Sequence, residues 1–543
     1  MKKQQQFFIF KFSSARLAKA KFKVEISLEQ ARINSELIAI NNSELVRALF
    51  RYKRVEFSQN SLDFILKMRK RLQKLPNTDE NREKMQIFNE KLENMLFIED
   101  LVTVEFENKS HYRAILKNRG FYVNGIRFTP FMASAGMIRR NTALFINNNV
   151  KHPLMDILEN GRNEKTPVVP AKLGAYFSLY SSSTLPVSFP NFAVVKDTEI
   201  QSLRKVDFVS YKGVGEDDDV TERDMVLKFN AFDGQGLISP RLAEEWSKEL
   251  DLDYTFSCAV IRAPYLKGLV CVFDFHSFAV EVAKEEHFTD IYGNNVSVWD
   301  VDLIISESMF KLYNAYESTQ DYVDKCEENG LGFSIAKVNP KVERSYSRTS
   351  YQFLQVLNLN DVDIARLCEP TIDWFRNISG GSAMDMLLYA TGENMFTEED
   401  FKRMDVITKA ILLDPLLSRD KYIQERFSKT VEKRKKESYM GGILINANYQ
   451  FMIADPYFQA ATIFNPNALP LLIEGEYFSN YWNEKGVEKV AAIRSPIVHH
   501  SEFNVLTFRK DDKVQKWFSH IKSGIIYPAN GIGVDWVRHG GAD

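Results

Sequence analysis

The spacing of apolar residues changes along this chain, and each period predicts a different element. Near the amino end, residues 7–12 (FFIFKF) alternate with a period of two, which predicts a β-strand. Apolar residues three or four apart at 62–75, and again at 85–95, predict two helices that are broken at Pro76. We therefore expect an antiparallel helical hairpin over residues 61–97.

The same reading divides the chain into four parts. Residues 1–190 mix strands and helices, residues 191–340 carry short strands with glycine-rich turns, residues 341–440 read as helices, and residues 441–543 return to short strands. The acidic run at 216–219 is interpreted as a solvated loop. The fold class that these patterns predict is α+β.

Composition narrows the class of protein. The chain has 543 residues, 45% of them hydrophobic and 26% charged, with a formal net charge of −2. Any nucleic-acid site must therefore come from local basic patches. Cys258, Cys271, Cys326 and Cys368 have no zinc-binding spacing, which favours a reduced, cytoplasmic location. No apolar run is long enough for a transmembrane helix, so no membrane association is expected.

Two blocks in the second part carry candidate chemistry. In FDGQGLISPRLA, residues 232–243, Ser239 is placed to cap a helix that starts at Pro240. In SCAVIRAPYLKGLVCVFDF, residues 257–275, Lys267 and Gly268 enter an apolar strand. A lysine on a rigid strand can neutralise phosphate charge. Lys311, in SESMFKLYN, is a second candidate, although residues 281–299 separate it from the first as an expected insertion.

Basic residues elsewhere are candidates for contact with a nucleic-acid backbone. Arg139 follows a strand and a serine-containing turn in RFTPFMASAGMIRR. Arg344 and Arg348 alternate with tyrosines in RSYSRTSY, a pattern that suits a strand held by charge and stacking. A solvated face is the alternative for Arg139, and the run from Arg344 equally suits the start of an amphipathic helix.

The last fifty residues hold the remaining candidates. The segment RSPIVHH begins at Arg494, and the chain ends in GGAD at Asp543. Asp455 precedes a proline, and we interpret it as a turn residue rather than a catalytic acid.

In their order along the chain, these blocks resemble the two-barrel RNA polymerase superfamily. The resemblance is to its eukaryotic-type RNA-dependent RNA polymerases and single-chain prophage enzymes. It covers residues 127–543, and it implies two double-psi β-barrels joined by helices after an N-terminal α+β region. The barrels would occupy 191–340, with an insertion, and 441–543. Asp543 would be the first acid of the family's D-x-D-G-D loop, so the second barrel is expected to be incomplete.

The resemblance also implies an activity and its participants. The enzyme would transfer nucleotides from ribonucleoside triphosphates to an RNA 3′-OH on a nucleic-acid template. Asp543 would hold Mg²⁺, Arg494 would face the ribose, and Lys267 and Lys311 would contact the triphosphate. An isolated chain that ends at this acid is expected to be inactive. The rest of the loop would belong to a longer form of this chain or to a second chain.

Two other readings stay open at this point. The Asp-x-Asp pairs at 251/253, 300/302 and 361/363 are compatible with a metal-dependent glycosyltransferase. The chain could also be a non-catalytic subunit that binds nucleic acid or holds a partner. The template, RNA or DNA, is undecided by the sequence, although the lysine- and asparagine-rich composition is typical of a phage or low-GC bacterial source and so favours DNA.

Overall fold

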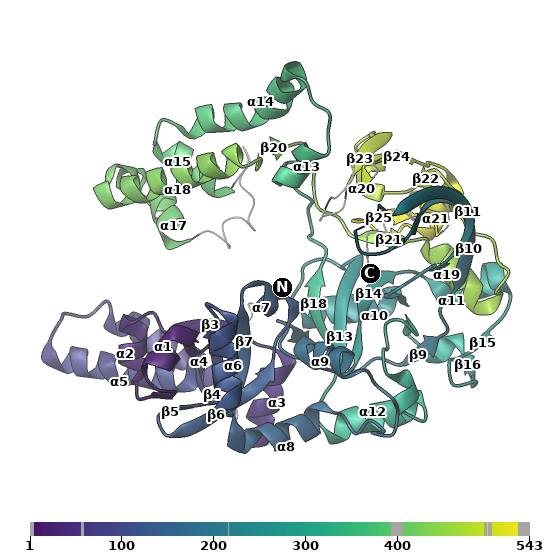
Figure 1. The fold of residues 1–543 in the computed structure, drawn as a ribbon. Helices are drawn as coiled ribbons and strands as arrows, with labels where there is room; N and C mark the ends of the chain where they lie inside the picture. The colour runs from purple at the N-terminus through teal and green to yellow at the C-terminus, as the bar shows by residue number, and fades with distance from the viewer. Residues whose placement is uncertain are drawn as a thin grey trace.

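The computed structural model describes residues 5–55, 59–215, 217–391, 405–493, 497 and 502–529, and it has a mixed α+β fold (Figure 1). Four regions follow one another: an N-terminal region, a first lobe built on a curled sheet, a helical connector, and a second lobe of short strands. No helix in the described part of the chain is long and apolar enough to span a bilayer.

The N-terminal region is built on a seven-stranded sheet. Its strands lie in the order β2 (Lys23–Val24), β5 (Phe121–Val123), β6 (Ile126–Met132), β7 (Thr142–Asn147), β4 (Phe97–Glu105), β1 (Gln6–Ser13) and β3 (Leu37–Asn41). Neighbouring positions of β4 bury opposite faces, because Leu101 and Val102 belong to separate apolar clusters. Both faces of the sheet are therefore covered.

Helices cover this sheet on both sides. They are α1 (Ser14–Lys19), α2 (Leu28–Ile33), α3 (Glu44–Lys53), α4 (Gln59–Leu72), α5 (Asp79–Leu96), α6 (Lys109–Lys117), α7 (Ala135–Arg139), α8 (Asn148–Leu158) and α9 (Pro170–Leu179). Ser27 and Gln30 close a capping box at the start of α2, and Ser43 caps α3. The apolar stripes at 62–75 and 85–95 correspond to α4 and α5.

The first lobe is a second seven-stranded sheet. Its order is β8 (Leu185–Pro186), β18 (Ser334–Val338), β13 (Cys258–Ala263), β14 (Leu266–Val272), β12 (Gln235–Ile238), β17 (Leu303–Ser306) and β9 (Phe192–Val195). Two pairs, β12 with β14 and β9 with β17, are parallel. The other elements are α10 (Pro240–Glu249), α11 (Phe275–Phe278), β15 (His287–Thr289), β16 (Asn295–Ser297) and α12 (Thr319–Glu328).

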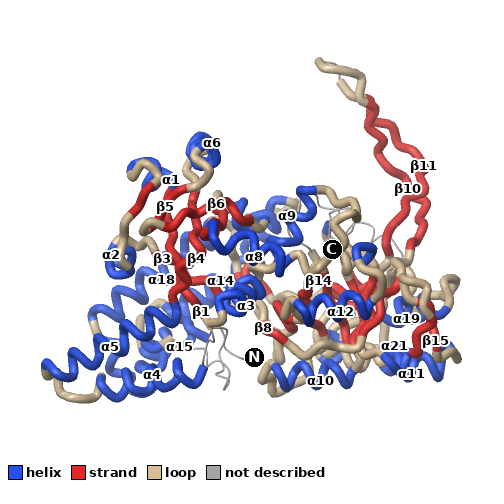
Figure 2. The backbone as a smooth tube through the Cα atoms, turned by 90° about the horizontal axis from the view of Figure 1, so that it is seen from below, coloured by secondary structure: helices blue, strands red, loops and turns tan. Residues whose placement is uncertain are grey.

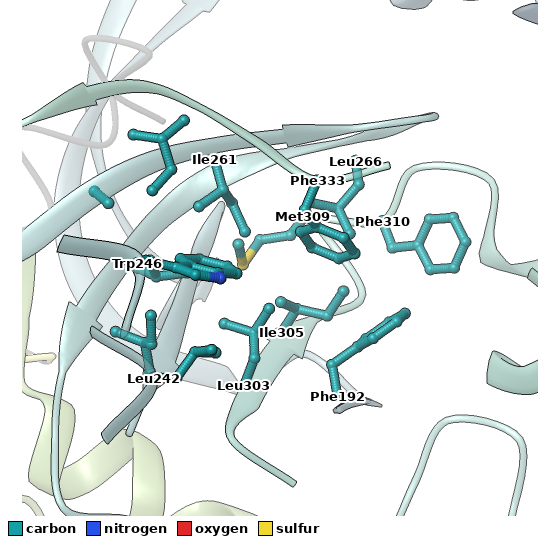
Figure 3. Packing of buried hydrophobic residues seen from close by; sticks show 14 of the residues in the cluster. Phe192, Leu242, Trp246, Ile261, Leu266, Leu303, Ile305, Met309, Phe310 and Phe333 are labelled. Atoms are coloured by element: carbon teal, nitrogen blue, oxygen red, sulfur yellow. The ribbon is translucent and has the colours of Figure 1, made fainter. Parts of the chain in front are cut away.

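One face of this sheet encloses the first core. Trp246 of α10 and Phe310 are fully buried there against Ile261, Leu303 and Met309 (Figure 3). The predicted capping of α10 is confirmed, since the Ser239 hydroxyl accepts the Leu242 N–H at 3.2 Å. The cap fixes the helix that carries Trp246 onto the sheet.

A long β-hairpin leaves the first lobe between β9 and β12. Its strands, β10 (Glu199–Ser210) and β11 (Asp219–Asn230), pair in one antiparallel register along their whole length. The hairpin projects away from the body of the molecule (Figure 2). The sequence analysis did not predict this hairpin and identified only its acidic tip.

The connector between the lobes is mainly helical. It contains β19 (Ser347–Arg348), α13 (Tyr351–Gln355), α14 (Asp361–Ile378), α15 (Ala383–Thr391), α17 (Val406–Leu413), α18 (Lys421–Tyr439) and β20 (Leu444–Ile445). Strands β19 and β20 pair at the point where the chain enters and leaves the helical connector. A small core of Met386, Leu387 and Ile411 packs between its helices.

The second lobe has only short strands. Its elements are β21 (Met452–Ala454), α19 (Pro456–Phe464), β22 (Glu476–Tyr477), α20 (Asn480–Glu484), β23 (Lys489–Ala492), β24 (Asn504–Phe508), α21 (Asp512–Trp517) and β25 (Ile525–Tyr527). β21 pairs with β25, β24 lies between β22 and β23, and a bridge from Phe478 to Ile526 links the two sheets.

The two lobes share one apolar cluster. Phe278 of the first lobe contacts Tyr457 and Trp517 of the second, with ring centroids 4.9 and 5.4 Å apart. Phe273 stacks on Trp517 at 5.9 Å. The second lobe is thus packed against the face of the first sheet that lies opposite the first core.

Candidate active site at the junction of the lobes

Lys267 is held on β14 by a close backbone approach. A Cβ atom added to Gly268 would lie 2.5 Å from the carbonyl oxygen of Gly234 and 2.5 Å from the methyl carbon of Met309. Only glycine fits at this position without moving the backbone of Gly234. The Lys-Gly pair of the sequence therefore places a lysine next to a close backbone contact in the sheet.

The structure brings Lys267 and Lys311 together. Leu266 bridges Phe310 in an antiparallel sense, the Lys267 N–H donates to the Met309 carbonyl, and the Lys311 N–H donates to the Tyr265 carbonyl, both at 3.1 Å. The expected insertion leaves the sheet after β14, forms the β15–β16 hairpin, and returns through β17. The long gap in sequence therefore closes in space.

The side chain of Lys267 lies on the face of β14 that meets the second lobe. Alternate residues of a strand point to opposite faces. Leu266 and Val270 pack in the first core, whereas Leu269 and Cys271 pack in the cluster that contains Ile453 and Ile526 of the second lobe. Lys267 shares its alternation with Leu269 and Cys271.

Two further basic side chains lie on the neighbouring strands of the same sheet. Arg262 of β13 is directly opposite Lys267 in the register. It is partly buried, burial lowers its pKa, and its Nε atom has no hydrogen-bond partner among the described residues. Lys337 of β18 lies 5.3 Å above the ring of Phe451 from the second lobe. Arg262 lies within the sequence block at residues 257–275, but no role was predicted for it there, and Lys337 was not predicted as a site residue.

A serine network supports the loops beside these lysines. The Ser308 hydroxyl donates to the Asp197 carboxylate and accepts the Gly234 N–H, each at 3.0 Å, and it lies 3.0 Å from the Ser306 hydroxyl. Burial raises the pKa of Asp197. The nearby carboxylates of Glu307 and Asp233 raise this pKa further, whereas the hydrogen bonds from Ser308 lower it. A cavity of about 710 Å³ opens beside Asp197 and Ser306, a volume in the range of ligand pockets.

A buried glutamine pair joins the lobes next to this network. The Gln235 side chain donates to the Ala454 carbonyl at 2.9 Å and accepts the Ala454 N–H at 2.8 Å, as a neighbouring strand would. It also donates to Gln459, whose side chain returns a bond to the Gln235 carbonyl, both at 2.9 Å. Gln235, between the two glycines of the sequence block, therefore fixes the second lobe against the first.

Asp455 has a structural role, and that prediction is confirmed. Its buried carboxylate accepts the N–H groups of Tyr457 and Phe458 at the start of α19, and those of Leu471 and Leu472. Desolvation raises the pKa of this carboxyl to about 6, against the effect of the four hydrogen bonds. The residue ties a loop to a helix.

The predicted nucleic-acid contacts lie in other regions. Arg139 is exposed at the end of α7 in the N-terminal region, and Arg344 is exposed at the start of the connector. The Arg348 guanidinium lies 4.7 Å above the Trp374 ring and donates to the Gly442 carbonyl at 3.4 Å. Arg348 thus stabilises the connector, and binding by these three arginines stays a prediction.

Arg494 and Asp543 lie outside the described residues. Within the described part of the chain, no group of three histidine, cysteine, aspartate or glutamate side chains could hold a metal ion. The described residues therefore do not supply the magnesium site that the resemblance implies.

The Asp-x-Asp pairs have structural roles where the structure shows their contacts. Asp302 is buried and accepts hydrogen bonds from Ser239 and Arg241. Asp363 completes a capping box with Asn360 at the start of α14. Asp253 pairs with Lys341 at 2.7 Å. These contacts weigh against a glycosyltransferase metal site.

Comparison with known proteins identifies the class. Residues 48–533 match the family described as RNA dependent RNA polymerase, and the chain belongs to this family. The family is named for the synthesis of RNA on an RNA template.

Two individual proteins resemble the chain at low sequence identity. The chain is 24% identical over 437 residues to the DNA-directed RNA polymerase YonO of Bacillus phage SPbeta, which covers 77% of this chain and 48% of that protein. The structure of the RNA dependent RNA polymerase QDE-1 from Thielavia terrestris aligns with a TM-score of 0.49 at 14% identity, over 81% of this chain and 47% of that chain. The chain spans about half the length of these relatives.

Proposed function

We propose that this chain forms the core of an RNA polymerase that copies a nucleic-acid template. In this proposal, residues 191–340 and 441–543 are the two double-psi β-barrels, residues 341–440 connect them, and residues 1–190 are an N-terminal support. The family match and the parallel strand pairs of the first sheet support this division.

The observation that carries the proposal is the backbone bridge between Leu266 and Phe310, which places the segments of Lys267 and Lys311 side by side. In nucleotidyl transfer, the 3′-oxygen of the growing RNA attacks the α-phosphorus of a ribonucleoside triphosphate. The bond to the β-phosphate breaks, and pyrophosphate leaves. The ammonium groups of Lys267, on a strand of the sheet, and of Lys311, in the turn bridged to that strand, would stabilise the negative charge that builds up on the phosphates. Gly268 and the Ser308 network hold the backbone that carries them.

The second lobe would complete the site. Arg494 is proposed to contact the ribose, and Asp543 to bind Mg²⁺, as the sequence analysis predicts. Strand β23 ends two residues before Arg494 and pairs with β24, so this part of the lobe has a defined framework. Gln235 and Gln459 hold β21 of the second lobe against the first lobe.

The template is either RNA or DNA, and the relatives are named for both. The test uses the protein as its gene encodes it, with labelled ribonucleoside triphosphates and single-stranded RNA or DNA templates. We expect incorporation into RNA on one template, and a loss of roughly 100-fold or more for Lys267→Ala. Lys248→Ala, on the exposed face of α10, is the matched control and should keep full activity.

Two results would contradict the proposal. Full activity of both Lys267→Ala and Lys311→Ala would show that these lysines do not contact the triphosphate. Binding of nucleic acid without any incorporation on either template would favour the non-catalytic alternative.

A further inference from the structure

The β10–β11 hairpin has two chemically different faces. Twelve residue pairs at about 3.3 Å per residue give a ribbon of roughly 40 Å, most of it outside the body of the protein (Figure 2). Residues directly opposite each other in the register share a face, and successive pairs alternate between faces. The register therefore assigns every side chain of the hairpin to one face or the other.

One face carries arginines among apolar side chains. It consists of Ile200, Ser202, Arg204, Val206, Phe208 and Ser210, with their opposite partners Phe229, Leu227, Met225, Arg223, Thr221 and Asp219. The only acidic residue on this arginine face is Asp219, at the far end beside the tip. The Nζ atom of Lys212 forms an ion pair with the Asp219 carboxylate at 2.8 Å.

The other face is dominated by carboxylates. Its charged residues are Glu199, Lys205, Asp207, Glu222, Asp224 and Lys228. Both of its lysines are paired with acids, Lys205 with Glu222 at 2.9 Å and Lys228 with Glu199 at 3.0 Å. This acidic face would repel a polyanion, and the arginine face would attract one.

The arginine face combines charge with an aromatic ring. The Arg223 guanidinium lies 4.1 Å above the centre of the Phe208 ring, and its Nε donates to the Thr221 hydroxyl at 3.1 Å. Phe208 is 37% exposed. A planar guanidinium held flat beside an exposed ring is the combination that binds phosphate and stacks on bases.

The root of the hairpin lies at the candidate active site. Ile200, on the arginine face, packs against Phe232 and Phe458, and the Thr198 hydroxyl donates to that of Thr462 at 3.1 Å. Asp197 and Gly234, just outside the two strands, are both bound by Ser308. The hairpin is thus anchored on both lobes, and Ser308, which binds both sides of its root, lies three residues before Lys311 in the sequence.

We propose that the arginine face of this hairpin binds the phosphodiester backbone of the nucleic acid that the two lobes copy. The inference rests on the proposed function. A two-stranded ribbon has the width of the major groove of a duplex, and the charge of this face complements phosphate. Arg204 and Arg223 would each contact a phosphate group, and Phe208 would contact the sugar or a base.

The test compares two double variants that remove the same charge. Arg204→Gln with Arg223→Gln changes the arginine face, and Lys205→Gln with Lys228→Gln changes the acidic face of the same strands. Binding of a labelled DNA duplex and of an RNA–DNA hybrid is titrated at several salt concentrations. For the arginine pair, we expect about tenfold weaker binding and a salt dependence reduced by about 2 in log–log slope. The lysine pair should leave both quantities near the wild-type values.

A photo-cross-linker supplies a second readout that does not depend on affinity. Benzoyl-phenylalanine at position 208 should cross-link to the bound nucleic acid, and the same group at position 209, on the acidic face, should not. Equal cross-linking at both positions, equal effects of the two double variants, or cross-linking only to protein would each overturn the proposal. A wild-type protein that binds neither probe would overturn it as well.

Failure of this inference can be told apart from failure of the proposed function. If the Arg204→Gln, Arg223→Gln variant keeps both RNA synthesis and nucleic-acid binding, the hairpin does not bind the nucleic acid, and the proposed polymerase activity is unaffected. Binding through position 208 without any synthesis would do the reverse.

Discussion

The two lobes are stabilised in different ways, although both contribute to one proposed site. The first lobe encloses a core of its own around Trp246 and Phe310. Among the described residues, the second lobe has strands of two to five residues, and the core within that lobe consists of Tyr477, Leu506, Phe508 and Tyr527. Most of its other buried apolar residues pack against the first lobe.

This difference implies that the second lobe depends on the first lobe for its stability. Short strands with little core of their own cannot bury enough apolar surface to be stable in isolation. The second lobe should therefore take its position from the first, through the shared aromatic cluster and the glutamine pair. A polymerase site built across the junction would be as rigid as that contact.

The largest expected effect is on the first core. Trp246→Ala removes a fully buried ring and should lower the free energy of unfolding by about 3–5 kcal/mol. Because the second lobe depends on the first, both lobes should lose stability together in guanidinium titrations. Trp299→Ala, at a 53% exposed position, is the control and should have a small effect. Loss confined to the first lobe would contradict the dependence.

Asp455 should make the stability of the second lobe depend on pH. Its pKa is raised to about 6, so protonation favours the folded state. The contribution of this carboxyl to the free energy of unfolding is complete below about pH 3.8 and is lost as the pH rises through about 6. Relative to Asp455→Asn, the wild type should lose on the order of 3 kcal/mol over this range.

Thermal unfolding of the wild type and Asp455→Asn between pH 4 and 7 measures this difference. Asp300→Asn, at an exposed aspartate, serves as the control for general pH effects. A stability difference that is flat over the range, or that changes in the opposite direction, would contradict the raised pKa.

The smallest expected effect is local to the junction. Gln235→Ala leaves the Ala454 N–H and carbonyl groups without their partner, at a cost of roughly 1–3 kcal/mol. Hydrogen exchange should speed up in β21 and β25 of the second lobe and change little in β13 and β14. Gln201→Ala, on the exposed hairpin, should alter neither. Uniform acceleration in both lobes would show that Gln235 supports the first lobe itself.

Local patterns in the sequence predicted some features well. The apolar stripes of α4 and α5, the cap at Ser239, and the turn role of Asp455 all follow from interactions within a few residues. The order of the sequence blocks identified the family, which the match to residues 48–533 confirms.

Features that depend on distant contacts could not be predicted in this way. The proximity of Lys267 and Lys311 needs the turn after β17 to return beside the start of β14, and the Gln235–Ala454 bonds join segments 219 residues apart. The β10–β11 hairpin was missed because its exposed strands mix charged and apolar residues on both faces. An alternating signal was present in EIQSLRKVDFVS, but the acidic tip drew the interpretation towards a loop.

A reactive ribonucleoside triphosphate can show which residues of the protein the bound nucleotide touches. A triphosphate with an amine-reactive group on its γ-phosphate is incubated with the protein, and the labelled peptides are mapped by mass spectrometry. We expect Lys267 and Lys311 to be labelled, and we expect unmodified triphosphate to compete this labelling away. Competed labelling confined to Lys196 in the 710 Å³ cavity, or to the surface lysines of α18, would contradict contact of the triphosphate with Lys267 and Lys311.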